Sequence, residues 1–389
     1  ENKDHFLKRG SVKKICLKCC AIALFSLQTN APSGGQGNRT SLRGGGPLTT
    51  IVLGTNLWET VWMNTLNEDF FSRLGDMSKS NGANIFPWLG PTHTSEKGQK
   101  TTPQDVNPQP MFWGMPRRIR VDFSKNVAGI CDICGCKSEG LVTNYIAKNY
   151  GINYEGGWRH VLTPHRQNKT EFFPIHGNPG GISYRHWLGV IQNDEERGLH
   201  PAAVVNEFKK RQSMLVEIDA AYRHSVRIWA LGYDFDNMKA RGWNESQMPF
   251  IHIDEQYREI YERTTFSMIK ISEIIVFNLR GSIKQALFEN SKSPDLSIID
   301  NRFWHESEDD FYRVLDNVRE TVSRGGSPIE IKREWVKSLS KKVEKIFDNY
   351  SQSAQLDVAD PKKIALSRRD LKIRSSEKGN KKLKDLIDI

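Results

Sequence analysis

Long apolar runs are missing from this chain. No stretch approaches the ~18 consecutive apolar residues of a membrane-spanning helix, and the short apolar segment at residues 21–27 lacks the cleavage pattern of a signal peptide. Hydrophobic residues nevertheless make up 38% of the 389 residues and include ten Trp, which is enough for packed cores. We therefore expect a water-soluble globular protein without a membrane partner.

Cysteine is also scarce, because six residues in 389 are too few for the disulfide framework of a small secreted domain. The six fall into two tight groups, which are Cys16, Cys19 and Cys20, and Cys131, Cys134 and Cys136. The first two members of each group have the Cys-x2-Cys spacing of a four-thiolate zinc site. Four thiolates leave no open coordination position, so the pattern predicts a structural zinc. The predicted ligands are Cys16, Cys19, Cys131 and Cys134, with Cys136 as an alternative to Cys134, and the competing interpretation is six buried free thiols.

Motifs of nucleotide-binding and hydrolytic enzymes are missing as well. The glycine-rich segment at residues 33–46 contains neither a Walker A motif nor a Rossmann fingerprint. Histidines are scattered at positions 160, 165, 176, 186 and 200, without the spacing of a metal-binding pair. We therefore expect no catalytic activity.

Glycine is concentrated in that one segment, where six of the 14 residues from position 33 to position 46 are glycine. Glycine lets a backbone approach a ligand closely, and Arg39 and Arg43 are available there for phosphate. A flexible surface loop is the alternative interpretation.

The net charge of +10 is confined to the ends of the chain. Residues 1–20 carry +4 and residues 361–389 carry +6, so the rest is neutral. Basic clusters that are restricted in this way favour phosphate contact over a generally solvated surface.

Sequence periodicity divides the chain into two domains of ordinary size. The first is expected over residues 1–250, with helices near 21–29, 57–66 and 201–221, strands near 48–53 and 119–123, and a polar loop over 75–110. Two further strands, 225–231 and 239–243, are expected to flank a hairpin tip at residues 232–237. Residues 251–389 have a 3.6-residue period with short breaks, which predicts a four-helix bundle. The fold class is therefore α+β: a mixed N-terminal domain with a four-cysteine zinc site, followed by a C-terminal four-helix bundle.

Six segments with distinctive sequences occur in order between residues 16 and 243. They are CLKCCAIALFSLQTNAPSGGQGNRTSLRGGGPLTT (16–50), MFWGMPRRIRV (111–121), CDICG (131–135), KNYGINYEGGWRHVLTPHR (148–166), PAAVVNEF (201–208) and LGYDFDNMKARGW (231–243). Together they resemble the CasA family, the large subunits of the type I-E CRISPR surveillance complex Cascade. The resemblance covers most of residues 3–250, and the bundle agrees by architecture. Family members carry a substantial N-terminal portion that is absent here, and the chain begins with Glu1 in place of Met, so we expect the true start to lie outside this sequence.

The resemblance implies a non-catalytic subunit in the cytoplasm of a prokaryote. Such a subunit reads the protospacer-adjacent motif (PAM) of double-stranded target DNA, starts strand separation and helps recruit a helicase-nuclease, while guide-RNA pairing supplies sequence specificity. Its implied partners are target DNA, the 5′ end of the guide RNA, the backbone and small subunits of Cascade, and the helicase-nuclease. The bundle, with its basic last helix, would lie along the displaced strand and stabilise it.

The resemblance also assigns roles to single residues. Ser33, Gly34, Gly35, Gln36 and Gly37 form a loop, here called the glycine loop, whose backbone would enter the narrow PAM minor groove beside Arg39. The family's lysine finger falls on Lys148. The loop over residues 4–12 would contact PAM-proximal DNA and the guide-RNA end through Lys8 and Arg9. The four zinc ligands of the family match Cys16, Cys19, Cys131 and Cys134.

A wedge that enters the duplex beneath the PAM maps to Asp236 and Asn237. Here the chain departs from family members whose wedge carries glutamine, since Asn237 is shorter and Asp236 is acidic. Phe235 or Met238 would share the wedging, because apolar side chains insert between base steps in other DNA-binding proteins. Without the resemblance, two alternatives stay open: a free-standing zinc-ribbon adaptor that binds nucleic acid, and a zinc hydrolase.

Overall fold

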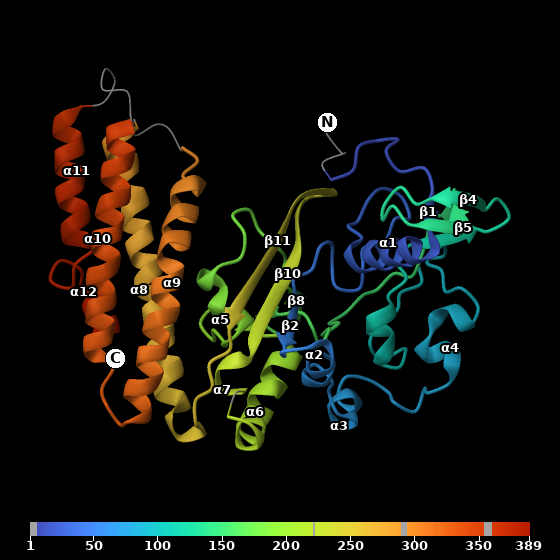
Figure 1. Cartoon of the computed structure of the whole chain (residues 1–389), viewed down its shortest axis with the longest axis horizontal. Helices are drawn as coiled ribbons and strands as arrows, with labels where there is room; N and C mark the ends of the chain where they lie inside the picture. The colour runs from blue at the N-terminus through green and yellow to red at the C-terminus, as the bar shows by residue number, and fades with distance from the viewer. Residues whose placement is uncertain (1–5, 221, 289–293, 354–359) are drawn as a thin grey trace. The chain divides into compact units, whose positions relative to one another are not determined.

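The computed structural model describes residues 6–220, 222–288, 294–353 and 360–389, and the chain forms two compact units. Unit 1 contains Glu1–Gly181, Glu195–Lys210 and Ile228–Gln247, and unit 2 contains Ile182–Asp194, Arg211–Arg227 and Met248–Ile389. The predicted fold class is confirmed: mixed α/β structure comes first and a helical region follows (Figure 1). The two-domain boundary at residue 250 stays a prediction. None of the described helices is long and apolar enough to cross a membrane.

Among the described residues, the strands form four small sheets. Their strand orders are β1 (Ile15–Cys16), β5 (Lys137–Val142) and β4 (Val127–Ile130); β11 (Lys239–Pro249), β10 (Arg227–Asp236) and β2 (Thr49–Leu53); β3 (Arg118–Asp122) and β6 (Asn144–Lys148); and β8 (Glu171–Pro174), β7 (His165–Asn168) and β9 (Leu199–His200). The helices before the bundle are α1 (Leu17–Asn30), α2 (Leu57–Met63), α3 (Glu68–Ser72), α4 (Gly82–Ile85), η1 (Pro87–Leu89), η2 (Gln109–Trp113), η3 (Tyr184–His186), α5 (Trp187–Val190), α6 (Ala203–Ile218) and α7 (Tyr222–Ser225).

The β10–β11 hairpin is longer than predicted. Its strands reach Asp236 and Lys239, so only Asn237 and Met238 form the turn, and residues 232–236 belong to a strand. Gly232 is needed in the strand because a Cβ there would lie 3.0 Å from the Pro47 carbonyl oxygen of the neighbouring segment. Asn237 has a φ of +54°, the left-handed conformation that tight hairpin turns require.

The expected polar loop over residues 75–110 contains short helices. Helix α4 and the 3₁₀ turn η1 lie within it. Asn81 caps the start of α4, because its side chain accepts a hydrogen bond from the Asn84 amide. Hydrophobic periodicity does not detect elements of a single turn, which form here through local capping.

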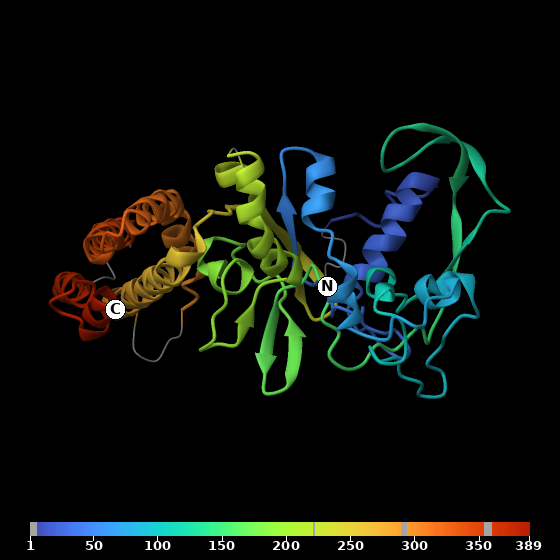
Figure 2. The same ribbon diagram turned by 90° about the horizontal axis from the view of Figure 1, so that it is seen from below.

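Four long helices form the predicted bundle in unit 2. They are α8 (Glu255–Leu287), α9 (Ser297–Ser323), α10 (Ile329–Ser353) and α11 (Pro361–Arg374), and a short α12 (Lys381–Asp388) follows them. They run alongside one another in Figure 1 and are seen nearly end-on in Figure 2. Tyr184, which precedes the bundle in sequence, completes its core: its ring stacks on Phe311 at 4.3 Å and its hydroxyl lies 2.8 Å from the Ser307 hydroxyl.

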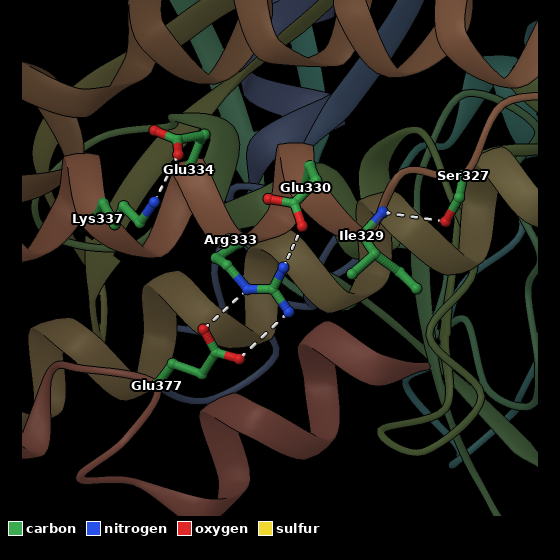
Figure 3. A network of polar contacts seen from close by, with 7 residues as sticks. All are labelled: Ser327, Ile329, Glu330, Arg333, Glu334, Lys337 and Glu377. Atoms are coloured by element: carbon green, nitrogen blue, oxygen red, sulfur yellow. Dashed lines mark hydrogen bonds and ion pairs between the residues drawn. The ribbon is translucent and has the colours of Figure 1, made fainter.

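A polar network joins α10 to the turn between α11 and α12 (Figure 3). The Arg333 guanidinium contacts Glu330 one turn earlier and reaches Glu377, with Nε 3.0 Å from Oε2. On the same helix, Lys337 pairs with Glu334 at 2.7 Å. The pair of Arg333 and Glu377 connects separate elements, whereas the pair of Glu334 and Lys337 lies on one exposed face of α10.

Candidate nucleic-acid interface and metal centre

The structure brings the four predicted metal ligands together. The sulfurs of Cys16, Cys19, Cys131 and Cys134 all lie within 4.8 Å of one another. A tetrahedral site with metal–sulfur bonds of ~2.3 Å has sulfur–sulfur edges of about 3.8 Å, and the Cys16 and Cys134 sulfurs are 3.8 Å apart. The cluster therefore fits a closed four-thiolate metal site.

Local backbone geometry prepares the second cysteine pair for a metal. The Gly135 amide donates to the Cys131 carbonyl at 3.0 Å, and Gly135 has a φ of +70°, so residues 131–135 form a tight turn. Backbone N–H groups of Cys134 and Cys16 donate to the Cys131 sulfur and lower the pKa of that thiol to about 6. Burial and the neighbouring Cys134 thiol raise the pKa of Cys19 to about 12. A bound cation would hold all four sulfurs as thiolates.

The cluster connects two segments that are distant in sequence. Strand β1 pairs with β5 through Ile15 opposite Val142 and Cys16 opposite Leu141. The Asp132 carboxylate accepts hydrogen bonds from the Lys13 and Lys14 amides at 2.7 and 2.9 Å.

Cys136 and Cys20 lie outside the four-sulfur cluster. Cys136 is exposed and contributes its carbonyl to the Cys131 amide, so the ligand alternative at this position is resolved in favour of Cys134. The centre anchors the start of α1, at whose other end the glycine-rich segment begins.

The glycine loop is held by the two residues that follow β6. The Tyr150 amide donates to the Gly37 carbonyl at 2.8 Å, and the Asn149 side chain donates to the Gln36 carbonyl at 2.9 Å. Gln36 in turn donates to the Tyr150 hydroxyl at 2.8 Å. A Cβ at Gly37 would lie 2.8 Å from the Asn149 Cβ, so this close packing depends on glycine.

Ser33, Gly35 and Gln36 are exposed at the crest of this loop. Gly35 has a φ of +71°, and a Cβ there would meet nothing within 4 Å. The loop closes on itself through the Asn38 amide, which donates to the Gly35 carbonyl at 3.3 Å. The loop is therefore closed by its own backbone and held by the residues that follow β6.

The hairpin turn lies against the glycine loop, since a Cβ at Gly34 would be 2.9 Å from the Met238 sulfur. Asp236, Asn237 and Met238 are all exposed there. Phe235 is half-buried instead, because a Cβ at Gly46 would overlap its ring. Of the two apolar side chains considered for wedging, Met238 is at the turn and Phe235 is packed in the strand.

Lys148 ends β6 and is exposed, directly before the two residues that hold the glycine loop. Lys8 and Arg9 are also exposed. Their segment lies beside the hairpin, where the Phe6 ring is 5.7 Å from the Tyr233 ring. Residues 4 and 5 of the predicted contact loop lie outside the described residues.

The two arginines of the glycine-rich segment have partners within the protein. Arg39 Nε donates to the Ser95 hydroxyl at 2.8 Å, and its guanidinium lies 5.9 Å from the centre of the Tyr150 ring. Arg43 is buried, its guanidinium donates to the Thr163 hydroxyl at 3.1 Å, and burial lowers its pKa to about 10. The expectation that Arg43 is available for phosphate is therefore wrong.

Sequence reasoning missed Asn149 and Tyr150 as the support of the glycine loop. Tyr150 has a φ of +63°, an uncommon conformation for a residue with a bulky side chain. The Asn-Tyr-Gly sequence after a strand is the local signal for a turn, but it does not identify the distant loop that the turn contacts.

Known protein structures share this architecture. The fold matches CRISPR-associated proteins of known structure. CasA of Thermus thermophilus aligns with a TM-score of 0.65 and 16% identity, over 92% of this chain and 72% of that protein. Cse1 of Thermobifida fusca aligns with a TM-score of 0.58 and 15% identity, over 98% and 73% of the respective chains.

The family follows from the sequence itself. The model of the family described as CRISPR-associated protein Cse1 matches residues 1–346. The chain therefore belongs to the Cse1 family, whose Thermus member is also called CasA. This confirms the resemblance, and favours a Cascade large subunit over a free-standing adaptor or a zinc hydrolase.

Proposed function

We propose that this Cascade large subunit reads the PAM of double-stranded target DNA and begins strand separation there. The observation that carries the proposal is the meeting of three distant segments in unit 1. Residues 33–37, Lys148 with the two residues after it, and the turn at Asn237 and Met238 are adjacent through the contacts of Gly34 and Gly37. A backbone loop, a cation and a protruding turn are the parts that such a function needs.

Minor-groove reading would fall to the glycine loop. The minor groove is ~6 Å wide and presents a degenerate set of donors and acceptors, so a backbone with small side chains suits it. Lys148 supplies a cation beside the loop for a base edge or a phosphate. Arg39 positions the loop through Ser95 and Tyr150.

Strand separation would fall to the hairpin turn. Asn237 and Met238 form the turn and are exposed, so they can enter a base step. Phe235 supports them from the strand by packing against Gly46. Asp236 lies beside the turn, where its negative charge disfavours contact with a phosphate.

The proposal extends to the metal, the N-terminal segment, the helical unit and the partners of the subunit. The metal is a structural zinc, because four thiolates close the coordination shell. Lys8 and Arg9 contact PAM-proximal DNA and the guide-RNA end, and the helical unit contacts the displaced strand and the small subunits. The subunit is non-catalytic, acts in the prokaryotic cytoplasm with the backbone subunits and guide RNA, and helps recruit the helicase-nuclease.

Two glycines provide a matched test of PAM reading in assembled Cascade. Gly37→Ala clashes with Asn149 and adopts an unfavourable φ, whereas Gly35→Ala has a similar φ and open space. Binding to a PAM duplex should weaken more in Gly37→Ala than in Gly35→Ala. Lys148→Ala should weaken this binding by about 1–3 kcal/mol if Lys148 reads a base edge. Equal losses on a PAM-less duplex would reject PAM reading.

Strand opening is tested separately. Asn237→Ala combined with Met238→Ala should slow the opening of a PAM duplex while Cascade assembly stays intact. Phe235→Leu is the control, because it keeps an apolar side chain in the strand. Unchanged opening in the double variant would reject the wedge.

A further inference from the structure

The β3–β6 ribbon in unit 1 has two chemically different faces. Arg118 pairs with Lys148 and Arg120 with Ile146 across the two strands. Because side chains alternate along a strand, Arg118, Arg120 and Lys148 share one face. The intervening side chains, Ile119, Val121 and Tyr145, line an apolar pocket with α1.

The basic face borders a groove of about 510 Å³. Its lining includes Trp88, His93, Arg118, Arg120 and Lys148. The Trp88 side chain is 53% exposed, although an indole of this size is normally buried in a folded protein. Trp113 meets it edge-on, with ring centres 5.7 Å apart and planes at 84°. Phe86 also packs against it, with ring centres 5.3 Å apart and planes at 41°. Two aromatic side chains therefore hold the indole, and the remainder of its surface is open to a ligand.

The charges of the groove favour an anion. Arg118 lies directly opposite Lys148, and like charges in this position destabilise a strand pair. Arg118 is neutralised by Glu96 at 2.7 Å. Within the described ranges, the side chains of Arg120 and Lys148 make no hydrogen bond or ion pair. The Asp122 carboxylate, two positions further along the same face of β3, accepts hydrogen bonds from Ser124. These bonds, with the charges of Lys125 and Arg120, lower its pKa, so Asp122 offsets part of the charge of Arg120.

From this geometry we infer that the groove binds single-stranded DNA, with a base stacked on Trp88 and phosphates at Arg120 and Lys148. Two cations on neighbouring strands, Arg120 on β3 and Lys148 on β6, suit successive phosphates of a polymer better than one small anion. The exposed surface of the indole suits an unpaired base, since base pairs in a duplex already cover one another. Stacking with an adjacent basic track is the general mode of single-strand binding. This site goes beyond PAM reading, which concerns duplex DNA: Lys148 belongs to both, whereas Trp88 and Arg120 belong to the single-strand site alone.

The test uses the purified chain, without guide RNA or PAM, so its outcome is independent of the proposed function. Fluorescence anisotropy of a labelled oligothymidylate measures binding across a salt series. Trp88→Ala should weaken binding about 5- to 150-fold with an unchanged salt slope, and Trp88→Phe should retain most of the affinity. Arg120→Gln should reduce the slope of log K against log salt by about 0.7.

Matched controls decide whether these losses belong to the groove. Trp58→Ala removes another exposed indole, on α2, and Arg166→Gln removes an exposed cation on β7. Losses in the controls equal to those in Trp88→Ala and Arg120→Gln would overturn the inference. It would also be overturned if Trp88→Ala weakened binding to a blunt duplex as much as binding to the single strand.

Discussion

Two buried histidines in unit 1 connect its stability to pH. Burial lowers the pKa of His160 well below its usual value, and the nearby Arg43 cation lowers it further. Burial, followed by the charge of Arg159, lowers the pKa of His165 to about 4. Both imidazoles are therefore neutral in the folded protein at pH values where an exposed histidine is protonated.

We expect unit 1 to lose stability as the pH falls below about 6.5, the ordinary histidine pKa. The unfolded chain then binds more protons than the folded chain, which lowers the free energy of unfolding until the folded pKa near 4 is reached. His165 alone contributes up to about 1.4 kcal/mol per pH unit, or about 1.6 kcal/mol between pH 6.5 and 5. Urea unfolding at several pH values measures this slope.

His165→Gln should reduce the pH slope, whereas His93→Gln, at an exposed position, should leave it unchanged. A slope in His165→Gln equal to that of the unsubstituted chain would contradict the assignment.

At the residue scale, the sequence predicts the metal ligands better than it predicts which side chains contact each other. The Cys-x2-Cys spacing identified all four clustered thiols, because the chemistry of a metal site is local. Arg39 and Arg43 look alike in the sequence. In the structure Arg43 is buried against Thr163, whereas Arg39 is half-buried near Tyr150. Both sets of contacts come from chain more than 50 positions away, so no local pattern distinguishes the two arginines.

At the element scale, ion pairs that join separate elements differ from those within one helix. The Arg333 and Glu377 side chains are 29% and 27% exposed and join α10 to the turn before α12. Glu334 and Lys337 are 67% and 57% exposed and lie on one face of α10. The more exposed pair is the weaker one, because water screens it.

Glu377→Gln should therefore lower the free energy of unfolding of the helical unit by up to about 1 kcal/mol. Glu334→Gln removes the same charge from the same network (Figure 3) and should change it by less than about 0.5 kcal/mol. Thermal unfolding followed by circular dichroism compares the two. A larger loss in Glu334→Gln would contradict this ranking.

The sequence predicted the long elements and missed the short ones. Helices α8–α11 follow from a 3.6-residue period sustained over many turns. The hairpin tip was predicted too long, because Gly232 and Asp234 resemble turn residues. In the structure Gly232 allows close approach to Pro47, and Asp234 pairs with Arg241 at 2.7 Å. Tertiary contacts thus give turn-type residues a place in a strand.

At the scale of the whole molecule, the cysteine cluster closes a loop between residues 19 and 131. By analogy with a disulfide, a cross-link over about 100 residues stabilises a fold by on the order of 4 kcal/mol. Cys131→Ser should therefore remove the metal and lower the melting temperature, whereas Cys136→Ser should retain both, since Cys136 is outside the cluster. Metal analysis should give one zinc per chain. Retention of zinc in Cys131→Ser, or its equal loss in Cys136→Ser, would contradict the site.

The positive charge at the C-terminal end of the chain is a candidate contact for the displaced strand. The segment 361–389 has a net charge of +6, but Arg368 is held by Asp348 at 2.7 Å, so it is not a free cation. Lys362, Lys363 and Lys372 are exposed on α11. If this helix contacts the displaced strand, each lysine releases counterions on binding.

Replacing these three lysines with Gln should reduce the salt slope of R-loop binding in assembled Cascade by about 2, or about 0.7 for each single-strand phosphate contact. Arg368→Gln removes one positive charge from the same helix, but it should affect the melting temperature more than the salt slope, because its charge is already neutralised by Asp348. A salt slope unchanged by the triple substitution would mean that the terminal charge faces solvent or another subunit. The displaced strand would then need another path.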